Sequence, residues 1–342
     1  MHSLAILFFL AVAEAAKPYP RPSLELELEA EGSGYFRALS REQRKVYLGA
    51  KLDDGHASKD HRILKGRTTA ETLPKNFVAG WDDWTECQNT IAYIKDQASC
   101  GSCWAVAASQ VVAHRMCIAC GGRKACADTA IYPELLNEHR PCMDMSAEQI
   151  LSCCSWCGEG CQGGYPIDAM QYWAKTGVVS GGWYGSRCGC QPYVIAPHMA
   201  HRGTPACSQS CEAGYPLSYA QDKHYANDAR KVVGEEAMME EIYHHGSIEC
   251  AFQVYSNFMQ YKNGIYNKAG GYFDGGHAIT IIGWGELQDG RKYWVINNSW
   301  NTTWGADGRF FWEKGTNLLG MESGCVAGTP RCNNHNNVLK CV

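Results

Sequence analysis

The sequence predicts an α+β fold of two lobes, and two changes of composition along the chain indicate it. Between residue 81 and about residue 215 the chain is dense in cysteine and glycine, and fifteen of its nineteen cysteines lie between Cys87 and Cys211. From residue 250 onward, β-branched and aromatic residues dominate and short turn sequences separate them. A helical, disulfide-rich half followed by a β half predicts two lobes with a cleft between them.

The N-terminus has the features of a signal peptide, which we expect to span residues 1–16. The short apolar run "LAILFFLAVA" is followed by small residues suited to cleavage, although the basic residues that usually precede such a run are missing. Nineteen cysteines also argue for an oxidising compartment, and their odd number leaves at least one thiol outside intrachain pairs. We expect a secreted or lysosomal protein without a membrane span.

Residues 17–72, called the N-terminal segment below, differ from the chain that follows. They contain no cysteine or tryptophan and include the charged run "REQRKVYLGAKLDDGHASKDHR". Such a stretch is typical either of a solvated, partly disordered tail or of a pro-segment that is removed on activation. We favour the pro-segment, and expect the lobes to follow as a helical lobe over 73–215 and a β lobe over 216–342.

Local patterns predict the main elements of each lobe. Apolar residues from Cys103 to Cys117 recur at helical spacing, and Ser102 is suited to cap that helix. The runs "HAITIIGWGE", "KYWVINNSW" and "GRFFWEKG" predict strands, with turns at "LQDG" and "GADG". The formal net charge of −4 gives no reason to expect nucleic acid as a partner.

The stretch "QASCGSCWAVAASQ" places Cys100 and Cys103 three residues apart. This spacing fits a redox pair, half of a zinc site, or a nucleophile beside a structural disulfide. A cysteine in the first turn of a helix is favoured as the nucleophilic thiolate. His277, preceded by Gly275 and Gly276, could form an ion pair with such a thiolate, and the glycines would let a substrate backbone come close.

Two further side chains complete a set suited to attack on an amide. Asn298, in "NNSWNTTWG", offers a carbonyl that can hold the second ring nitrogen of His277. Gln97 lies six residues before Cys103 and could donate its side-chain N–H to an oxyanion, with the Cys103 backbone N–H as the second donor.

Taken in order, "QASCGSCW", "CQGGYP", "GGHAI" and "NNSWNTTWG" resemble the papain-like cysteine proteases. The sequences "SCC", "QDKHY" and "VYSNFMQYKNGIY" are similar to cathepsin B in particular. The stretch "YWVINNSWNTTWGA" partly resembles a motif of helminth-type homologues, although Thr303 and Ala306 replace its acidic positions. The resemblance covers about residues 73–330 and implies a papain-like two-lobe fold with a β-barrel lobe. It also implies Cys103 as nucleophile, His277 as general base and acid, Asn298 as orienter, Gln97 as oxyanion donor, Trp300 as a shield over the Asn–His hydrogen bond, and Gly163 and Gly164 as backbone partners of substrate.

The resemblance further implies five disulfides and no metal or organic cofactor. The pairs are Cys87–Cys117, Cys100–Cys161, Cys153–Cys207, Cys154–Cys157 and Cys190–Cys211. A partner for Cys100 at Cys161 leaves Cys103 unpaired, which disfavours the redox reading, and cysteine-crowded secreted domains favour disulfides over zinc. Eight cysteines remain without an assigned partner: Cys120, Cys126, Cys142, Cys188, Cys250, Cys325, Cys332 and Cys341.

Departures from the family pattern bear on specificity. The loop that in cathepsin B captures a substrate's C-terminal carboxylate with two adjacent histidines is short here, and its histidines, His198 and His201, are separated by Met-Ala. We therefore expect endopeptidase activity to dominate. Gly324 takes the place of an acidic residue at the floor of the pocket for the P2 side chain, which predicts apolar or aromatic P2 residues; an alignment slip would make Glu322 the candidate instead. Ala98 replaces a usual glycine and would be strained at positive φ.

The sequence thus predicts a cysteine endopeptidase made as a zymogen, acting on protein and peptide substrates. Its own pro-segment and cystatin-type proteins are the expected inhibitors. The rival is a catalytically silent homologue that binds peptides or inhibitors. Asn297 and Asn301 begin glycosylation sequons, of which Asn301 is the better candidate.

Overall fold

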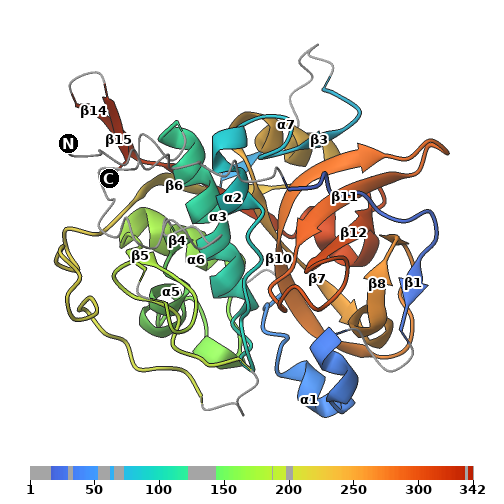
Figure 1. Ribbon diagram of the computed structural model, residues 1–342, viewed down its shortest axis with the longest axis horizontal. Coiled ribbons are helices and arrows are strands. Elements are labelled where there is room, and N and C mark those ends of the chain that lie inside the picture. The colour runs from blue at the N-terminus through green and yellow to red at the C-terminus, as the bar shows by residue number, and fades with distance from the viewer. Residues whose placement is uncertain are drawn as a thin grey trace, which may run out of the picture.

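The computed structural model describes residues 17–29, 34–52, 62–64, 73–121, 144–186, 188–197, 203–335 and 338–341. Two lobes lie side by side, and α1 (Arg41–Lys45) lies beneath their junction (Figure 1). One lobe holds helices α3 (Cys103–Ala119), α5 (Ala147–Cys153) and α6 (Pro166–Lys175). The other holds the long strands β7 (Ile248–Tyr255), β10 (Phe273–Glu286), β11 (Lys292–Asn297) and β12 (Arg309–Glu313). The predicted α+β class is confirmed.

Helix α3 is the central element of the helical lobe. It begins at Cys103, as predicted, and every residue from Cys103 to Cys117 is buried. A helix surrounded by protein needs no face suited to water, and its polar residues Ser109, Gln110, His114 and Arg115 are buried as well. Ser102 is the N-cap residue, as predicted, but its side chain accepts no helix N–H; its hydroxyl oxygen lies 2.8 Å from the hydroxyl oxygen of Tyr193 instead.

The shorter helices have recognisable starts. Ser146 caps α5 by accepting the Gln149 N–H at 2.9 Å. Pro166 occupies the first turn of α6, where its missing N–H costs no hydrogen bond. Helices α2 (Gln88–Ile91) and α7 (Glu235–His245) complete the α-helices that are described.

A nine-stranded mixed sheet forms the β lobe. Its order is β2 (Arg62–Leu64), β6 (Ala226–Val232), β13 (Cys325–Pro330), β7, β10, β11, β12 and β9 (Ile265–Tyr266), with β3 (Phe77–Val78) paired to β10. The three predicted strands are β10, β11 and β12, and the predicted turn at 287–290 joins the first two. Within the described residues this order has two ends, so the expected barrel is an open sheet.

Smaller elements complete the described chain. The two-stranded pairs are β1 (Glu27–Leu28) with β8 (Tyr261–Asn263), β4 (Asp144–Met145) with β5 (Ser180–Gly181), and β14 (Cys332–His335) with β15 (Val338–Cys341). The 3₁₀ turns are η1 (Gly34–Ala38), η2 (Thr85–Cys87), η5 (Gly160–Gln162), η6 (Ser256–Gln260) and η7 (Leu318–Ser323).

Two apolar clusters form the interior, one under the sheet and one around α3. Six tryptophans are among the largest fully buried side chains: Trp104, Trp173, Trp284, Trp294, Trp304 and Trp312. The abundant aromatic residues therefore serve mainly the core. None of the helices in the described residues is long and apolar enough to cross a membrane.

Candidate active site

Cys103 lies at the first residue of α3, where the lobes meet. Its thiol is outside any disulfide and is fully buried. The neighbouring Cys100 is bonded to Cys161, and the Gly101 N–H donates to the Cys161 carbonyl at 3.0 Å. The C-x-x-C sequence thus contains one disulfide-bonded cysteine, Cys100, and one reduced cysteine, Cys103, at the N-terminal end of a helix.

His277 comes from β10 in the opposite lobe, and Asn298 directly follows β11. The Nε2 of His277 lies 2.8 Å from the Oδ1 of Asn298, which also accepts the Ser299 N–H at 2.8 Å. The bond from the Ser299 N–H identifies Oδ1 as the oxygen of the Asn298 amide. Because an amide oxygen can only accept, the Nε2 of His277 carries the hydrogen of the ring. The Trp300 ring stacks on the imidazole with its centroid 4.4 Å away. Asn298 and Trp300 therefore hold the ring in one orientation.

The other ring nitrogen, Nδ1, is buried without a hydrogen bond among the described residues. The residue after His277, Ala278, directs its backbone N–H at the Cys103 sulfur. His277 and Cys103 thus adjoin each other across the junction of the lobes.

The Gln97 side chain is fixed on both sides. Its oxygen accepts the Ser299 hydroxyl at 2.6 Å, and its Nε2 donates to the Cys100 carbonyl at 2.7 Å. The same Nε2 donates to the carbonyl of Tyr47 at 2.9 Å. A primary amide nitrogen has two hydrogens, so one positions the group and the other is offered to a carbonyl from the N-terminal segment.

The N-terminal segment crosses the site as an extended backbone. The Gly164 N–H donates to the Gly49 carbonyl at 2.8 Å, and the Lys51 N–H donates to the Gly164 carbonyl at 2.9 Å. On the other lobe, the Gly276 carbonyl accepts the Ala50 N–H at 3.1 Å. The cleft therefore receives a polypeptide through backbone hydrogen bonds, as strand addition does.

Two glycines of the cleft are required by this close approach. Gly163 has φ +117°, and a β-carbon there would lie 2.6 Å from the Gly49 oxygen. A β-carbon on Gly276 would overlap the Ala50 oxygen. Any larger residue at either position would push the bound backbone away.

Burial keeps the Cys–His pair uncharged in this structure. Burial raises the pKa of the Cys103 thiol to about 11, although the N–H groups of Ala278, Gly49 and Trp104 favour the thiolate. Burial also lowers the pKa of His277 to about 4, against the opposing effect of its bond to Asn298. In this covered state a neutral thiol faces a neutral imidazole.

A cavity of about 220 Å³ adjoins the cleft, and its lining includes Gly324, Ala251, Ile167 and Leu52 of the N-terminal segment. Glu322 does not line it. The Glu322 carboxylate is buried and accepts the Trp294 indole N–H at 2.9 Å and two backbone N–H groups. The Glu322 carboxylate therefore does not face this cavity, whereas Gly324 lines it.

The structure contains the five disulfides that the resemblance implies: Cys87–Cys117, Cys100–Cys161, Cys153–Cys207, Cys154–Cys157 and Cys190–Cys211. A sixth, Cys250–Cys325, joins facing positions of β7 and β13 and was not assigned from the sequence. Cys325 also lines the pocket beside Gly324, so this bond ties together the strands that form the pocket floor.

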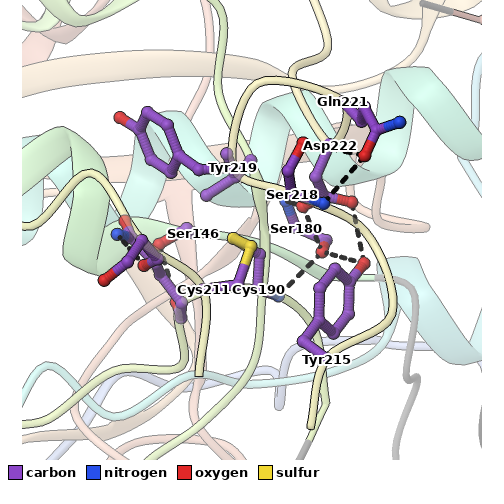
Figure 2. The surroundings of a disulfide bond; sticks show 12 residues. Ser146, Ser180, Cys190, Cys211, Tyr215, Ser218, Tyr219, Gln221 and Asp222 are labelled. Atoms are coloured by element: carbon purple, nitrogen blue, oxygen red, sulfur yellow. Dashed lines mark hydrogen bonds between the residues drawn. A yellow bond between two sulfur atoms is a disulfide. The ribbon is translucent and has the colours of Figure 1, made fainter. Parts of the chain in front are cut away.

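The loop that carries His198 and His201 is anchored near the Cys190–Cys211 bond. Figure 2 shows Ser180 and Tyr215 converging on Asp222; the Asp222 carboxylate accepts both hydroxyls, at 2.6 and 2.7 Å. The Ser180 hydroxyl in turn accepts the Cys190 N–H at 3.0 Å. His198 and His201 themselves lie outside the described residues.

Two sequence expectations concern single residues. Ala98 has φ +56°, so the left-handed backbone that would strain an alanine is present. Asn297 is buried, with its amide bonded to the Ile91 carbonyl and to Arg309, which leaves no room for a glycan on the folded chain. Among the described residues, no group of three or more His, Cys, Asp or Glu side chains could hold a metal ion.

The sequence analysis did not predict the hydrogen-bond partners of the Gln97 side chain. Ser299 orients Gln97, and Tyr47 occupies the free hydrogen of the same amide. Ser299 lies next to Asn298 in the motif, so its position in the sequence was a usable signal. Tyr47 lies in a charged stretch with no local feature that marks a cleft contact.

The papain family cysteine protease model matches residues 79–329. A gut-specific cysteine proteinase of Caenorhabditis elegans is 41% identical over 82% of this chain and 82% of its own length. Cathepsin B-like cysteine proteinase 3 of the same organism is 40% identical over 80% of this chain and 70% of its own. The structure of procathepsin B S9 from Trypanosoma congolense superposes with a TM-score of 0.70 at 30% identity, covering 87% of this chain and 91% of that one.

The fold and the Cys–His–Asn arrangement are those of a cysteine protease, and the chain belongs to the papain family. Within that family it is a cathepsin B-like cysteine protease. The resemblance drawn from the sequence motifs is confirmed.

Proposed function

We propose that this protein is a cysteine endopeptidase in which Cys103 is the nucleophile and His277 the general base and acid. Asn298 orients His277, and Gln97 with the Cys103 N–H binds the oxyanion. The observation that carries this proposal is the hydrogen bond from the Gln97 amide to a peptide carbonyl, that of Tyr47, in a cleft that also contains Cys103 and His277.

In the proposed reaction the Cys103 thiolate attacks the scissile carbonyl carbon, and the oxygen takes the negative charge. Gln97 and the Cys103 N–H stabilise that oxyanion. The imidazolium of His277 gives its proton to the leaving nitrogen, the C–N bond breaks, and a thioester remains. Water then loses a proton to His277 and attacks the thioester, and cleavage of the C–S bond restores the thiolate.

We further propose that the N-terminal segment, residues 17–72, is an inhibitory propeptide that follows a signal peptide at 1–16. Its support is the continuous backbone contact of residues 47–51 with both sides of the cleft. The lobes at 73–215 and 216–342 then form the mature enzyme. Such a zymogen suits the secreted or lysosomal route, where its disulfides are stable. Cystatin-type proteins are proposed inhibitors of the uncovered cleft.

Endopeptidase action is favoured because His198 and His201 are not adjacent and the segment between Cys190 and Cys207 is short. A catalytically silent role finds no support, since Gln97, Cys103, His277 and Asn298 are all present, Asn298 orients His277 and Ser299 orients Gln97.

The test is a mass-spectrometric time course of one defined peptide mixture, digested by the processed enzyme and by its Cys103→Ala variant. We expect internal cuts that follow apolar P2 residues and that disappear in the variant. Stepwise loss of C-terminal dipeptides would contradict the endopeptidase mode and indicate carboxylate capture by His198 and His201. Absence of cleavage by either protein would contradict the enzymatic role.

A further inference from the structure

The N-terminal segment contacts the sheet a second time, away from the reacting residues. After the cleft contact at residues 49–51, it forms strand β2, which lies parallel to β6. The register pairs Ile63 with Lys231, and the Val233 N–H donates to the Leu64 carbonyl at 3.3 Å. One covering segment therefore occupies both the cleft and a sheet edge.

Strand β6 becomes an edge strand once the N-terminal segment leaves. Among the described strands, its two neighbours are β2 on one side and β13 on the other. Removal of β2 uncovers a row of backbone N–H and carbonyl groups, and such a row is a template for another strand. In a mature enzyme this edge needs either a new partner or water.

This edge lies beside the P2 pocket. Lys231 is paired with Ile63 of β2 and also lines the cavity that contains Gly324 and Leu52. A lysine side chain spans about two residues of extended chain at roughly 3.3 Å each. A peptide that places its P2 side chain in the pocket therefore reaches the β6 edge with the residues that precede P3.

The direction of a substrate follows from the same contacts. The N-terminal segment runs from Tyr47, whose carbonyl meets Gln97, to Leu52 in the pocket. A substrate cleaved as proposed has its P1 carbonyl at Gln97 and its P2 side chain, one residue earlier, in the pocket. It thus runs the opposite way and would lie antiparallel to β6, the pairing that is slightly more stable per residue.

We propose that the exposed edge formed by the end of β6 and the residue after it, from Arg230 to Val233, binds substrate residues P4 to P6 by antiparallel strand addition. The preferred substrates are then long, extended polypeptides rather than short peptides. This inference rests on the proposed peptidase function and adds a subsite to it. The affinity comes from backbone hydrogen bonds, so it is largely independent of the side chains at P4 to P6.

The first test measures kcat/KM of the processed wild-type enzyme on capped peptides that share one cleavage sequence and grow from P2 to P7. We expect kcat/KM to rise about tenfold as P4 to P6 are added, mainly through KM, which is the gain of two or three net backbone hydrogen bonds. N-methylation of single residues should abolish the gain at alternate positions only, because successive N–H groups of a strand point to opposite sides. A flat series beyond P3, or equal effects of all N-methyl groups, would overturn the proposal.

A matched pair of variants tests the same edge from the enzyme side. Val233→Pro removes the N–H that bonds to Leu64, while Val233→Ala truncates the same side chain but keeps the N–H. We expect the proline variant to lose about three- to tenfold of the long-peptide advantage and the alanine variant to keep it. Equal behaviour of both would contradict the proposal. The shortest peptide separates the edge subsite from the peptidase function: if the wild-type enzyme does not cleave it, the peptidase function itself is wrong. If Val233→Pro does not fold, the N-methyl series on the wild-type enzyme decides about the edge subsite.

Discussion

At the scale of single residues, neighbours decide what a side chain can do. Glu322 and Gly324 are two residues apart, yet the Glu322 carboxylate already accepts hydrogen bonds from the Trp294 indole and from two backbone N–H groups. A buried, fully bonded carboxylate cannot also meet a substrate cation without losing those bonds. Glu322 therefore gives no negative charge to the cavity lined by Gly324, which we take as the proposed P2 pocket.

Gly324→Glu should create selectivity for arginine at P2. We expect the kcat/KM ratio of Arg-P2 to Leu-P2 peptides to rise at least about tenfold, which corresponds to one new charge pair worth roughly 1.4 kcal/mol. A β-carbon at position 324 would lie 2.5 Å from the Ala251 oxygen, so the melting temperature should fall as the backbone adjusts. Gly324→Gln is the control of equal size, and the same ratio in both variants would show that charge is not the cause.

At the scale of elements, the cross-strand bond Cys250–Cys325 links the two strands beneath the pocket. Strand β13 pairs on one side with β6 and on the other with β7, so it connects the proposed edge subsite to the pocket floor. Because the bond spans 75 residues of chain, it also restricts the unfolded state.

Replacing both cysteines by alanine, at positions 250 and 325, should lower the free energy of unfolding by about 2–4 kcal/mol. We expect KM for Leu-P2 peptides to rise while kcat changes little, since the strands shape the pocket and not the reacting atoms. Chemical denaturation and steady-state kinetics measure the two effects. Removal of Cys153–Cys207, a bond outside the pocket lining, is the control and should affect stability alone. An unchanged KM after removal of Cys250–Cys325 would contradict the proposal that this bond shapes the pocket.

At the scale of the whole molecule, folding changes the protonation of the active-site imidazole. Between pH 6.5 and 4 an exposed imidazole takes up a proton, whereas the buried His277, with its pKa lowered to about 4, does not. The folded chain then binds fewer protons at His277 than the unfolded chain. Its stability is complete above pH 6.5 and decreases as the pH falls toward 4.

The inactive zymogen Cys103→Ala should therefore lose stability on acidification, by up to about 3 kcal/mol from His277. Thermal unfolding at pH 7, 5.5 and 4.5 measures it. Glu148, whose pKa burial raises to about 7, acts in the opposite direction, so the informative comparison is with Cys103→Ala/His277→Ala. The second variant should show a weaker dependence on pH in this window; identical profiles would exclude His277 as the coupled group.

Much of the fold and of the site could be predicted from local sequence. The helix start at Cys103, the strand that begins before His277 and the hairpin after it follow from apolar spacing and turn residues within a few positions of each other. The ordered motifs around Gln97, Cys103, His277 and Asn298 indicated the family and, with it, five disulfides. Ser102 shows the limit of local rules, because a tertiary partner, Tyr193, replaced the predicted capping bond.

By itself, the sequence determined which residues could form the catalytic group and which class of fold would hold them. Only the tertiary structure decided that Tyr47 meets Gln97, that Cys250 faces Cys325, that Glu322 is turned away from the pocket and that β2 covers β6. The physical reason is distance along the chain. Propensities and caps act over a few residues, whereas these contacts join segments that 50 or more residues separate, or depend on partners that only packing supplies.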